Sequence, residues 1–298
     1  MKCGPGAKNK RAGSNTCYDV RMLMAIRNAY NQHERDPQKR IHSPTPKVVL
    51  AALRSRMADQ CDQEECWLKL LPPQKRQYIA KHIFAPRQPK EWLRNSREWL
   101  SNYDICNVLR QYEEAYPEFE FLGPSPIDFD ERLPSKSACV WNELCRFQLA
   151  NYKSKHTKKI GVVLNLDEHT KGGSHWVALY LDLEHQVVFY LDSALNDVPE
   201  EVETFVQRVM GQGDKLGMCM RFRKNRIQHQ FSNTECGMYC LFFLITLITE
   251  RWGGQGRPVN VLAALNKFES VRIPDAVVMK FRERYYNPPE ESGSMDTA

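Results

Sequence analysis

The chain has 298 residues, of which 42% are hydrophobic, enough for one large core or for a catalytic core with a smaller second domain. Its 42 Lys and Arg exceed its 36 Asp and Glu by six, a small excess compared with that of a dedicated nucleic-acid binder. The longest apolar run, Met238 to Ile248, is shorter than the roughly 20 residues that cross a bilayer. We therefore expect a soluble protein without a membrane span.

The distribution of basic residues indicates which partners the protein could bind, and the pattern of cysteines indicates its cellular compartment. Residues 1–46 hold nine basic and three acidic residues. Such a cluster is more often simply a solvated surface. The alternative is that this N-terminal region binds nucleic acid or an acidic protein. The ten cysteines lack a short disulfide framework and no signal peptide is recognisable, so the sequence favours a reducing, intracellular compartment.

The first third of the chain is predicted to be helical. Apolar residues recur at helical spacing from Tyr18 to Tyr30, and Thr45 before Pro46 is a favourable start for a second helix. Further helices are predicted over residues 62–71, 74–83 and 88–112. This pattern predicts a helical N-terminal domain over residues 1–115, with a flexible basic start.

The remainder mixes strands and helices. A proline-rich loop at 123–128 and a helix-like stretch at 136–150 precede predicted strands at 160–166, 175–183 and 186–191. Helices at 199–210, 235–250, 259–268 and 274–286 and a further sheet segment at 218–228 follow. We predict an α+β fold, a mixed sheet flanked by helices, over residues 116–287, and a disordered tail at 288–298.

Cys236 is the candidate nucleophile. A thiol attacks only as a thiolate, which the amides and dipole at a helix start favour. Ser232 and Glu235 fit a capping box that would begin a helix just before Cys236, and Gly237 leaves room for a substrate backbone. Cys240, four residues later, fits a buried structural cysteine better.

Three other residues complete a catalytic set. His175 opens an apolar strand and is the candidate base, and Asp192 ends the next strand, where its carboxylate could orient the imidazole. Gln230 lies six residues before Cys236, where its amide could donate to a developing oxyanion. Each residue alone has a structural explanation; the ordered set carries the prediction.

This ordered set, with Trp176 after the histidine and Gly237 after the cysteine, resembles the ubiquitin-like-protein (SUMO-type) cysteine proteases over about residues 120–250. Within that superfamily, residues 229–237, HQFSNTECG, and the block at 123–130 are most similar to the polyprotein-processing proteases of African swine fever virus and related large DNA viruses. The resemblance implies a papain-like core and a helical N-terminal domain. It also implies cleavage of structural polyproteins after Gly-Gly during virion maturation, in the host cytoplasm and the virion.

Two alternative functions remain open. Asp192 stands where the swine fever enzyme has asparagine, as in the cellular deconjugases, so removal of SUMO or ubiquitin-like proteins is the second hypothesis. A third is a non-catalytic scaffold that binds nucleic acid or capsid proteins. Trp176 and Gly237 are the candidate substrate-binding residues, because a narrow cleft between them would admit residues without a Cβ. No cofactor and no metal are expected, since Cys61, Cys66 and His82 make only a weak zinc pattern.

Overall fold

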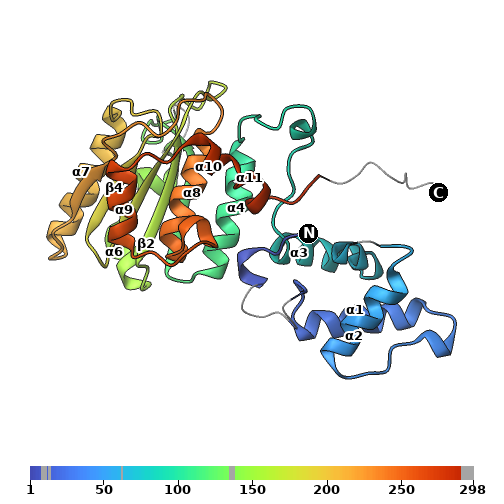
Figure 1. Cartoon of the computed structure of the whole chain (residues 1–298). Coiled ribbons are helices and arrows are strands. Elements are labelled where there is room, and N and C mark those ends of the chain that lie inside the picture. Colours follow the sequence, from blue (N-terminus) through green and yellow to red (C-terminus); the bar gives the residue numbers. More distant parts are fainter. Residues whose placement is uncertain (8–11, 13–14, 62, 134–137, 290–298) are drawn as a thin grey trace. The chain divides into compact units, whose positions relative to one another are not determined.

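The computed structural model describes residues 1–7, 12, 15–61, 63–133 and 138–289. The chain divides into two compact units, shown in Figure 1. Unit 1 comprises Met1–Lys90 with Glu283–Ala298, and unit 2 comprises Glu91–Arg282. Over the described residues, no helix combines the length and the apolar character needed to cross a bilayer.

Unit 1 is a small helical unit with its own core. Tyr18 and Trp67 stack with ring centroids 6.1 Å apart, and Phe84 meets Tyr18 edge-on at 5.6 Å. Asp19 caps the first long helix by accepting a hydrogen bond from the Met22 amide. The helices are η1 (Pro5–Ala7), α1 (Val20–His33), η2 (Pro37–Lys39), α2 (Pro46–Met57), η3 (Glu64–Leu70) and α3 (Pro73–Ile83).

Six cysteines are paired in the structure. The disulfides are Cys3–Cys17, Cys61–Cys66 and Cys139–Cys145. The expectation of unpaired cysteines is therefore wrong for these six, because the fold brings together partners whose spacing follows no regular framework. Cys61 and Cys66 are bonded to each other, which also removes them as a zinc-ligand pair.

Unit 2 is built on one five-stranded sheet in the order β1-β2-β3-β4-β5. Strands β2, β3 and β4 pair antiparallel, and the outer strands β1 and β5 pair parallel to their neighbours. The strands are β1 (Phe119–Pro126), β2 (Lys159–Asn165), β3 (Trp176–Asp182), β4 (Val187–Leu191) and β5 (Arg221–Lys224). The helices within unit 2 are α4 (Asn102–Ala115), α5 (Asn142–Cys145), α6 (Leu149–Ser154), α7 (Glu200–Lys215), α8 (Cys236–Thr249), η5 (Trp252–Gly254), α9 (Val261–Ser270) and α10 (Asp275–Met279). Two short helices, η4 (Lys90–Leu93) and α11 (Arg282–Tyr285), contain the points of the chain at which the units divide. The mixed sheet with flanking helices confirms the predicted fold class.

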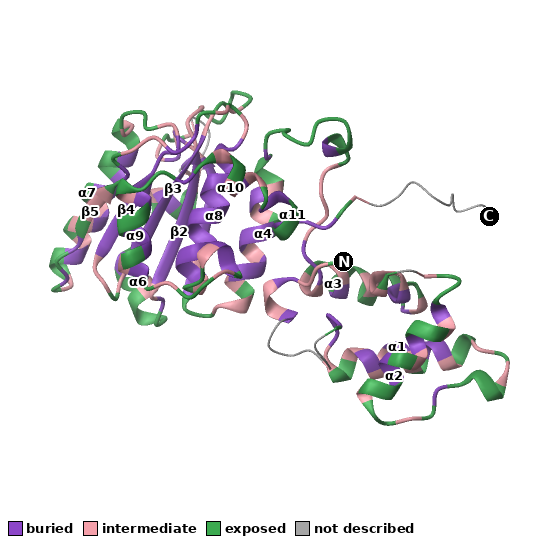
Figure 2. Cartoon of the chain, viewed as in Figure 1, coloured by how far each residue is buried: buried purple, intermediate pink, exposed green. Residues whose placement is uncertain are grey.

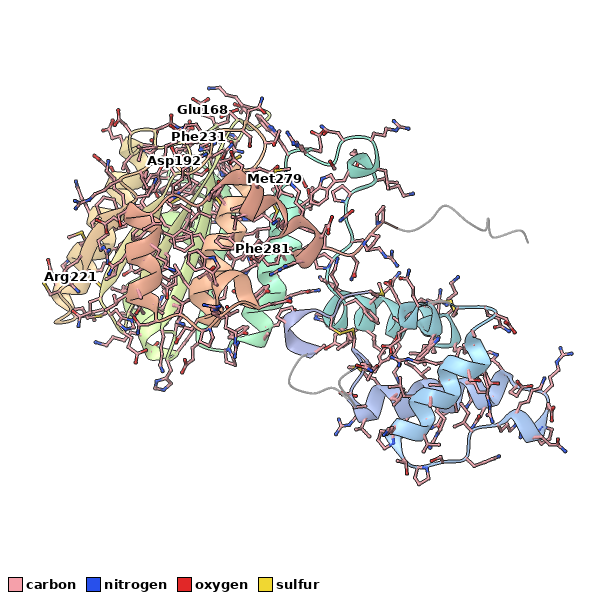
Figure 3. All side chains as sticks on the ribbon, viewed as in Figure 1. Glu168, Asp192, Arg221, Phe231, Met279 and Phe281 are labelled. Atoms are coloured by element: carbon pink, nitrogen blue, oxygen red, sulfur yellow. A yellow bond between two sulfur atoms is a disulfide. The ribbon has the colours of Figure 1, made fainter. Side chains whose placement is uncertain are left out.

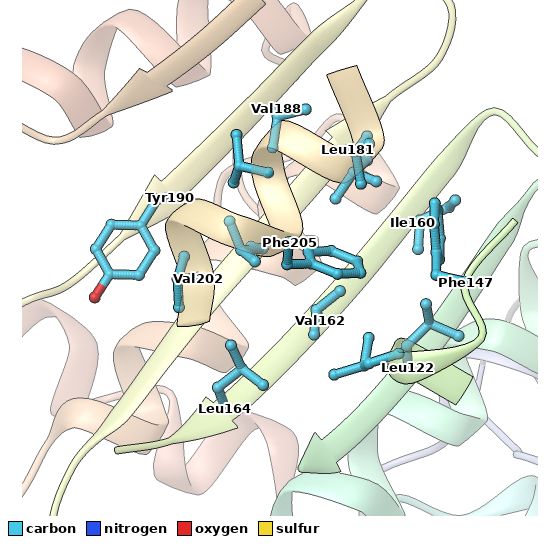
Figure 4. Packing of buried hydrophobic residues seen from close by; sticks show 14 of the residues in the cluster. Leu122, Phe147, Ile160, Val162, Leu164, Leu181, Val188, Tyr190, Val202 and Phe205 are labelled. Carbon is cyan, nitrogen blue, oxygen red and sulfur yellow. The ribbon is translucent and has the colours of Figure 1, made fainter. Parts of the chain in front are cut away.

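Alternate strand residues face different helices, so the sheet is buried on both sides. Ile160, Val162 and Leu164 of β2 pack with Phe205 of α7 in one apolar cluster, shown in Figure 4. Gly161 points to the opposite face, where a Cβ would lie 3.2 Å from Leu244 of α8. The glycine therefore allows α8 to lie close against the sheet.

Helix α8 is the central helix of unit 2. All its residues from Cys236 to Ile248 are buried, as the purple ribbon in Figure 2 shows. At its C-terminal end, the Lys159 ammonium donates to the carbonyl oxygens of Leu247 (2.9 Å) and Ile248 (3.3 Å) and to Glu250 Oε1 (2.8 Å). A cation that satisfies the last carbonyls stabilises a helix at this position.

Two segments differ from the predictions. The expected loop at 123–128 is mostly the second half of strand β1, whose register breaks between Leu122 and Ser125. The expected helix at 88–112 is interrupted, since only Asn102–Ala115 forms α4, and Ser101 with Asp104 closes a capping box at its start.

The predicted boundary at residue 115 also differs from the division of the chain. Helix α4 packs on β1 and α8 and so belongs to unit 2, and the division falls at Lys90. Most of the predicted disordered tail, residues 290–298, lies outside the described residues.

Replacing Lys159 with methionine is expected to lower the free energy of unfolding by about 1–3 kcal/mol, because two buried carbonyls at the end of α8 lose their donor. Urea denaturation followed by tryptophan fluorescence measures the change. Lys158→Met is the matched control: the Lys158 side chain is 43% exposed and pairs with Glu118 on the surface, so its loss should leave the free energy of unfolding nearly unchanged. Equal losses in the two variants would contradict the proposed capping role of Lys159.

Candidate active site

The sheet register brings His175 and Asp192 together. Ala178 of β3 pairs with Leu191 of β4, so the residue before β3 and the residue after β4 lie at the same edge of the sheet. There the His175 Nε2 atom donates a hydrogen bond of 2.6 Å to Asp192 Oδ1. Figure 3 labels Asp192 at this edge, with Phe231 of the neighbouring loop close by.

The loop before His175 is held by its own side chains. Asn165 Oδ1 accepts hydrogen bonds from the backbone amides of Asp167 and Ser174, and the Asp167 carboxylate binds the Gly173 amide and the Ser174 hydroxyl. Gly173 has φ +91°, and a Cβ there would lie 2.8 Å from the Asn165 side chain. The turn that starts β3 with His175 thus requires glycine at 173.

Asp192 is buried but fully hydrogen-bonded. Oδ1 also accepts from the Ala194 amide, and Oδ2 accepts from the backbone and side chain of Asn196. The Asn225 side chain accepts a hydrogen bond from the Asp192 backbone amide (3.0 Å) and donates one to the Asp192 carbonyl oxygen (2.7 Å). These contacts fix the carboxylate against His175.

The charges of this pair stabilise each other. Burial alone would lower the pKa of His175, but hydrogen bonds to Asp192 and Cys236 and the charges of both groups outweigh it and raise the pKa to about 9. Burial alone would raise the pKa of Asp192, but the His175 hydrogen bond and charge lower it. At neutral pH the pair is therefore an imidazolium and a carboxylate.

Cys236 is the first residue of α8, and its side chain hydrogen-bonds His175. Because Nε2 of His175 is bound to Asp192, Nδ1 is the ring nitrogen left for the sulfur. The unpaired amides and positive dipole end of a 14-residue helix favour an anion at this position. Cys240, in contrast, is buried inside the helix, and burial raises its pKa well above the ordinary value.

The predicted capping box before Cys236 does not form. The helix begins at Cys236 with Glu235 as its N-cap, and within the described part of the chain the buried Ser232 hydroxyl has no hydrogen-bond partner. The Glu235 carboxylate is instead held by Arg282, whose Nε and Nη2 atoms lie 3.0 and 3.2 Å from its oxygens. Both side chains of this ion pair are at most 5% exposed.

Arg282 joins three segments near Cys236. Besides Glu235, its guanidinium donates to the carbonyl oxygens of Glu98 (2.7 Å) and Thr234 (3.2 Å). It also lies over the Trp92 ring at 4.5 Å. The residue thereby fixes the segment around Glu98 and the residues directly before Cys236.

Gln230 lies in the loop between β5 and α8. Its Oε1 atom accepts a hydrogen bond from Ser193 Oγ (2.7 Å), and its Nε2 atom donates to the Ser232 carbonyl oxygen (2.6 Å). The backbone amide of Gln230 also donates to the Ser193 carbonyl oxygen at 2.8 Å. One N–H of the side-chain amide is left after these contacts.

The two predicted substrate-binding residues both meet Leu100. The Trp176 indole donates to the Leu100 carbonyl oxygen at 2.8 Å, and a Cβ on Gly237 would lie 3.0 Å from the Leu100 side chain. The absence of a side chain at 237 thus serves close packing with Leu100, which differs from the expected open space for substrate. A substrate contact of Trp176 or Gly237 stays a prediction.

A cleft of about 580 Å³ lies beside the site. Neither His175 nor Cys236 lines it, but the residues adjoining His175 do: Gly172, Gly173 and Trp176. Trp99 and Trp141 add aromatic surface to its wall. Trp99, which lies in the irregular segment before α4, is 41% exposed.

A possible cation-binding group lies apart from the cysteine. Of the described residues, Asp128, Glu131 and His169 place ligand atoms within 4.8 Å of one another. His169 Nδ1 already bonds Asp128 Oδ2 at 2.6 Å, so these two groups satisfy each other without a metal. The arrangement at Cys236 consists of a thiol, an imidazole and a carboxylate.

Three residues that support this arrangement are not predictable from the sequence motifs. Asn225 was assigned to a strand, and Ser193 and Arg282 carried no motif. The one available signal was the run of polar residues directly after two strands, where site residues often gather.

Comparisons with known proteins show the family of this chain. The C-terminal catalytic domain of the Ulp1 protease family matches residues 129–290. A thiol protease of Acanthamoeba polyphaga mimivirus is 25% identical over 267 residues, covering 83% of this chain and 84% of the relative. The SUMO-1 cysteine protease of African swine fever virus is 28% identical over 256 residues, covering 80% and 88%.

A solved structure is similar in fold. The crystal structure of the African swine fever virus protease gives a TM-score of 0.64 at 21% identity, over 96% of this chain and 97% of that one. The family match spans more than half of the present chain. The protein therefore belongs to the Ulp1 protease family and is a cysteine peptidase.

Proposed function

We propose that the protein is an endopeptidase that cleaves viral structural polyproteins after Gly-Gly-type sites during virion maturation. The observation that carries the peptidase chemistry is the chain of contacts from Asp192 through His175 to Cys236 at the start of α8. The viral proteases among the relatives support a viral substrate. The enzyme would then act at the assembly site in the host cytoplasm and within the virion.

Each of the four candidate catalytic residues has a separate role in the proposed reaction. Cys236 Sγ attacks the scissile carbonyl carbon, and the protonated His175 then gives its proton to the leaving amine. A water molecule, deprotonated by the neutral His175, hydrolyses the acyl-enzyme and releases Cys236. Asp192 holds the imidazole and stabilises its charge, and the amides of Gln230 and Cys236 donate to the oxyanion.

The surroundings of the sulfur favour glycine on the acyl side of the bond. Cys236 is only 2% exposed, so a substrate reaches it through a restricted approach. Trp176 is fixed by its bond to Leu100, and the Leu100 side chain packs on Gly237. A substrate backbone without a Cβ passes such bulky neighbours most easily.

Deconjugation is the second candidate function. One viral relative is named a SUMO-1 cysteine protease, and Asp192 supplies the carboxylate seen in cellular deconjugases. The same four residues would cut an isopeptide bond after the terminal glycine of a modifier. Activity on a folded modifier but none on short peptides would favour this function over polyprotein cleavage.

A substrate panel tests the proposal directly. Peptides ending in Gly-Gly-x are expected to be cleaved faster than Ala-Gly-x peptides, with Cys236→Ala and His175→Ala each lowering kcat at least about 10³-fold. Mass spectrometry of the products locates the cleaved bond, and a SUMO fusion serves as the folded comparison. Efficient cleavage after bulky residues would contradict the Gly-Gly assignment.

The pH dependence tests the His175–Asp192 pair. Because His175 has a raised pKa of about 9, it loses its proton only as the pH rises through that value, so kcat/KM should fall on the alkaline side near pH 9. Asp192→Asn removes the negative charge that raises this pKa. The alkaline limb of the pH profile of kcat/KM should then move toward the ordinary histidine pKa of about 6.5.

A charge-matched control separates this effect from a general one. Asp197 is exposed in the same loop, so Asp197→Asn should leave the alkaline limb where it is in the wild type. An unchanged limb in Asp192→Asn would rule out the assigned role of the carboxylate.

Gln230→Ala is expected to lower kcat about 10²- to 10³-fold with little change in KM, because an oxyanion donor acts mainly in the transition state. Ser193→Ala keeps the amide but removes the hydroxyl that holds its oxygen, so a smaller loss is expected. Steady-state kinetics on one Gly-Gly-x peptide measures both variants. A wild-type kcat for Gln230→Ala would remove this residue from the mechanism.

A further inference from the structure

Charge is distributed unevenly between the two units. Unit 1 holds 19 Lys and Arg against 11 Asp and Glu, whereas unit 2 holds 23 against 25. The positive excess of the chain therefore resides in unit 1, whose residues do not enter the peptidase site described above. A compact unit with such an excess attracts polyanions at long range.

The exposed face of α3 combines cations with an aromatic ring. The helix contains no acidic residue, and Lys75, Tyr78 and Lys81, each three residues from the next, follow one another along an exposed strip beside the buried Ile79. Tyr78 is 63% exposed, and its ring centroid lies 4.3 Å from that of His82. An exposed tyrosine flanked by lysines offers a base a face on which to stack and offers the adjoining phosphates positive charge.

A groove adjoins this face within unit 1. It has a volume of about 570 Å³ and lies between α1 and the connection from η3 to α3. Its basic lining residues are His33, Lys69 and Lys75, and no acidic residue is found among the described residues that line it. Lys75 belongs to both the groove and the α3 face, so the two features form one continuous surface.

The amides in the groove also favour an anion. Asn28 and Gln32 of α1 line it, together with apolar residues. Asn28 Oδ1 accepts two hydrogen bonds from the Arg27 guanidinium, at 3.1 and 2.8 Å. The Asn28 amide group therefore remains as a donor for an anionic oxygen.

We propose that the α3 face and this groove bind single-stranded nucleic acid without sequence preference. Lys69, Lys75 and the groove amides contact phosphates, and Tyr78 stacks on a base. The exposed ring favours nucleic acid over an acidic peptide, which would use the cations alone. It favours a single strand because the face of a base inside a duplex is already stacked.

Fluorescence anisotropy of a labelled oligo-dT 20-mer with the full chain, at several NaCl concentrations, tests this surface. Phosphate contacts by Lys69 and Lys75 predict a slope of log Kd against log salt of about 1.4, and the double variant Lys69→Ala/Lys75→Ala should remove nearly all of that slope. Tyr78→Ala should weaken binding at least about fivefold without changing the slope, and Tyr78→Phe should bind like the wild type.

The controls separate this surface from general charge effects. Lys215→Ala/Lys224→Ala removes two exposed lysines of unit 2 and should leave Kd within about twofold. All variants should retain peptide cleavage and the wild-type circular dichroism spectrum, since none of these residues belongs to the peptidase site.

Two results would overturn the proposal. The first is an absence of oligonucleotide binding at 50 mM NaCl up to about 100 μM protein, the weak end of non-specific affinity. The second is equal binding of a polyglutamate peptide and the oligonucleotide, with no effect of Tyr78→Ala, which would assign the surface to an acidic protein.

Discussion

Helix α8 has no exposed face, and the position of Cys236 depends on that burial. Every residue from Cys236 to Ile248 is enclosed, so the helix cannot shift along its axis without opening gaps in a close-packed core. Its ends are fixed by different charges: Lys159 satisfies the last carbonyls, and Arg282 holds Glu235 at the beginning. Cys236 is thus set at the edge of the sheet where His175 stands.

The buried pair of Glu235 and Arg282 also shapes the electrostatics of the site. An unpaired carboxylate directly before Cys236 would oppose a thiolate, and the guanidinium cancels that charge. The helix dipole and the imidazolium of His175 then act on the sulfur without a competing anion. Because removing one partner of a buried pair costs about 3–5 kcal/mol, Arg282 couples folding of this region to the geometry of the site.

Much of the fold and the candidate site could be predicted because its signals are local. The apolar run of α8 and the apolar runs of strands β2 to β4 can each be recognised in a short window of sequence, and His175, Asp192, Gln230 and Cys236 each stand at the end of such a run or just beside one. The supporting contacts are not local: Asn225 reaches Asp192 across 33 residues, and Arg282 reaches Glu235 across 47. No spacing rule predicts such pairs.

Other differences arise because tertiary contacts overrode a local preference. The prolines at 124 and 126 indicate a loop, yet β1 is an edge strand with an irregular register, where proline is tolerated. Ser232 and Glu235 have the spacing of a capping box, but Arg282 takes the glutamate. The irregular segment before α4 was read as helix, although Leu100 makes its contacts with Trp176 and Gly237 there.

Unit 1 is joined to the end of the chain, which determines how its role can be isolated. Asn287 donates to the carbonyl oxygens of Lys2 and Ala85, so the C-terminal segment is part of this unit. Deleting the basic N-terminal residues would also remove α1, whose Leu23 and Ile26 are fully buried. Loss of binding after such a deletion would be indistinguishable from unfolding. Substitutions confined to exposed side chains change the charge and the aromatic surface while the core of unit 1 stays intact.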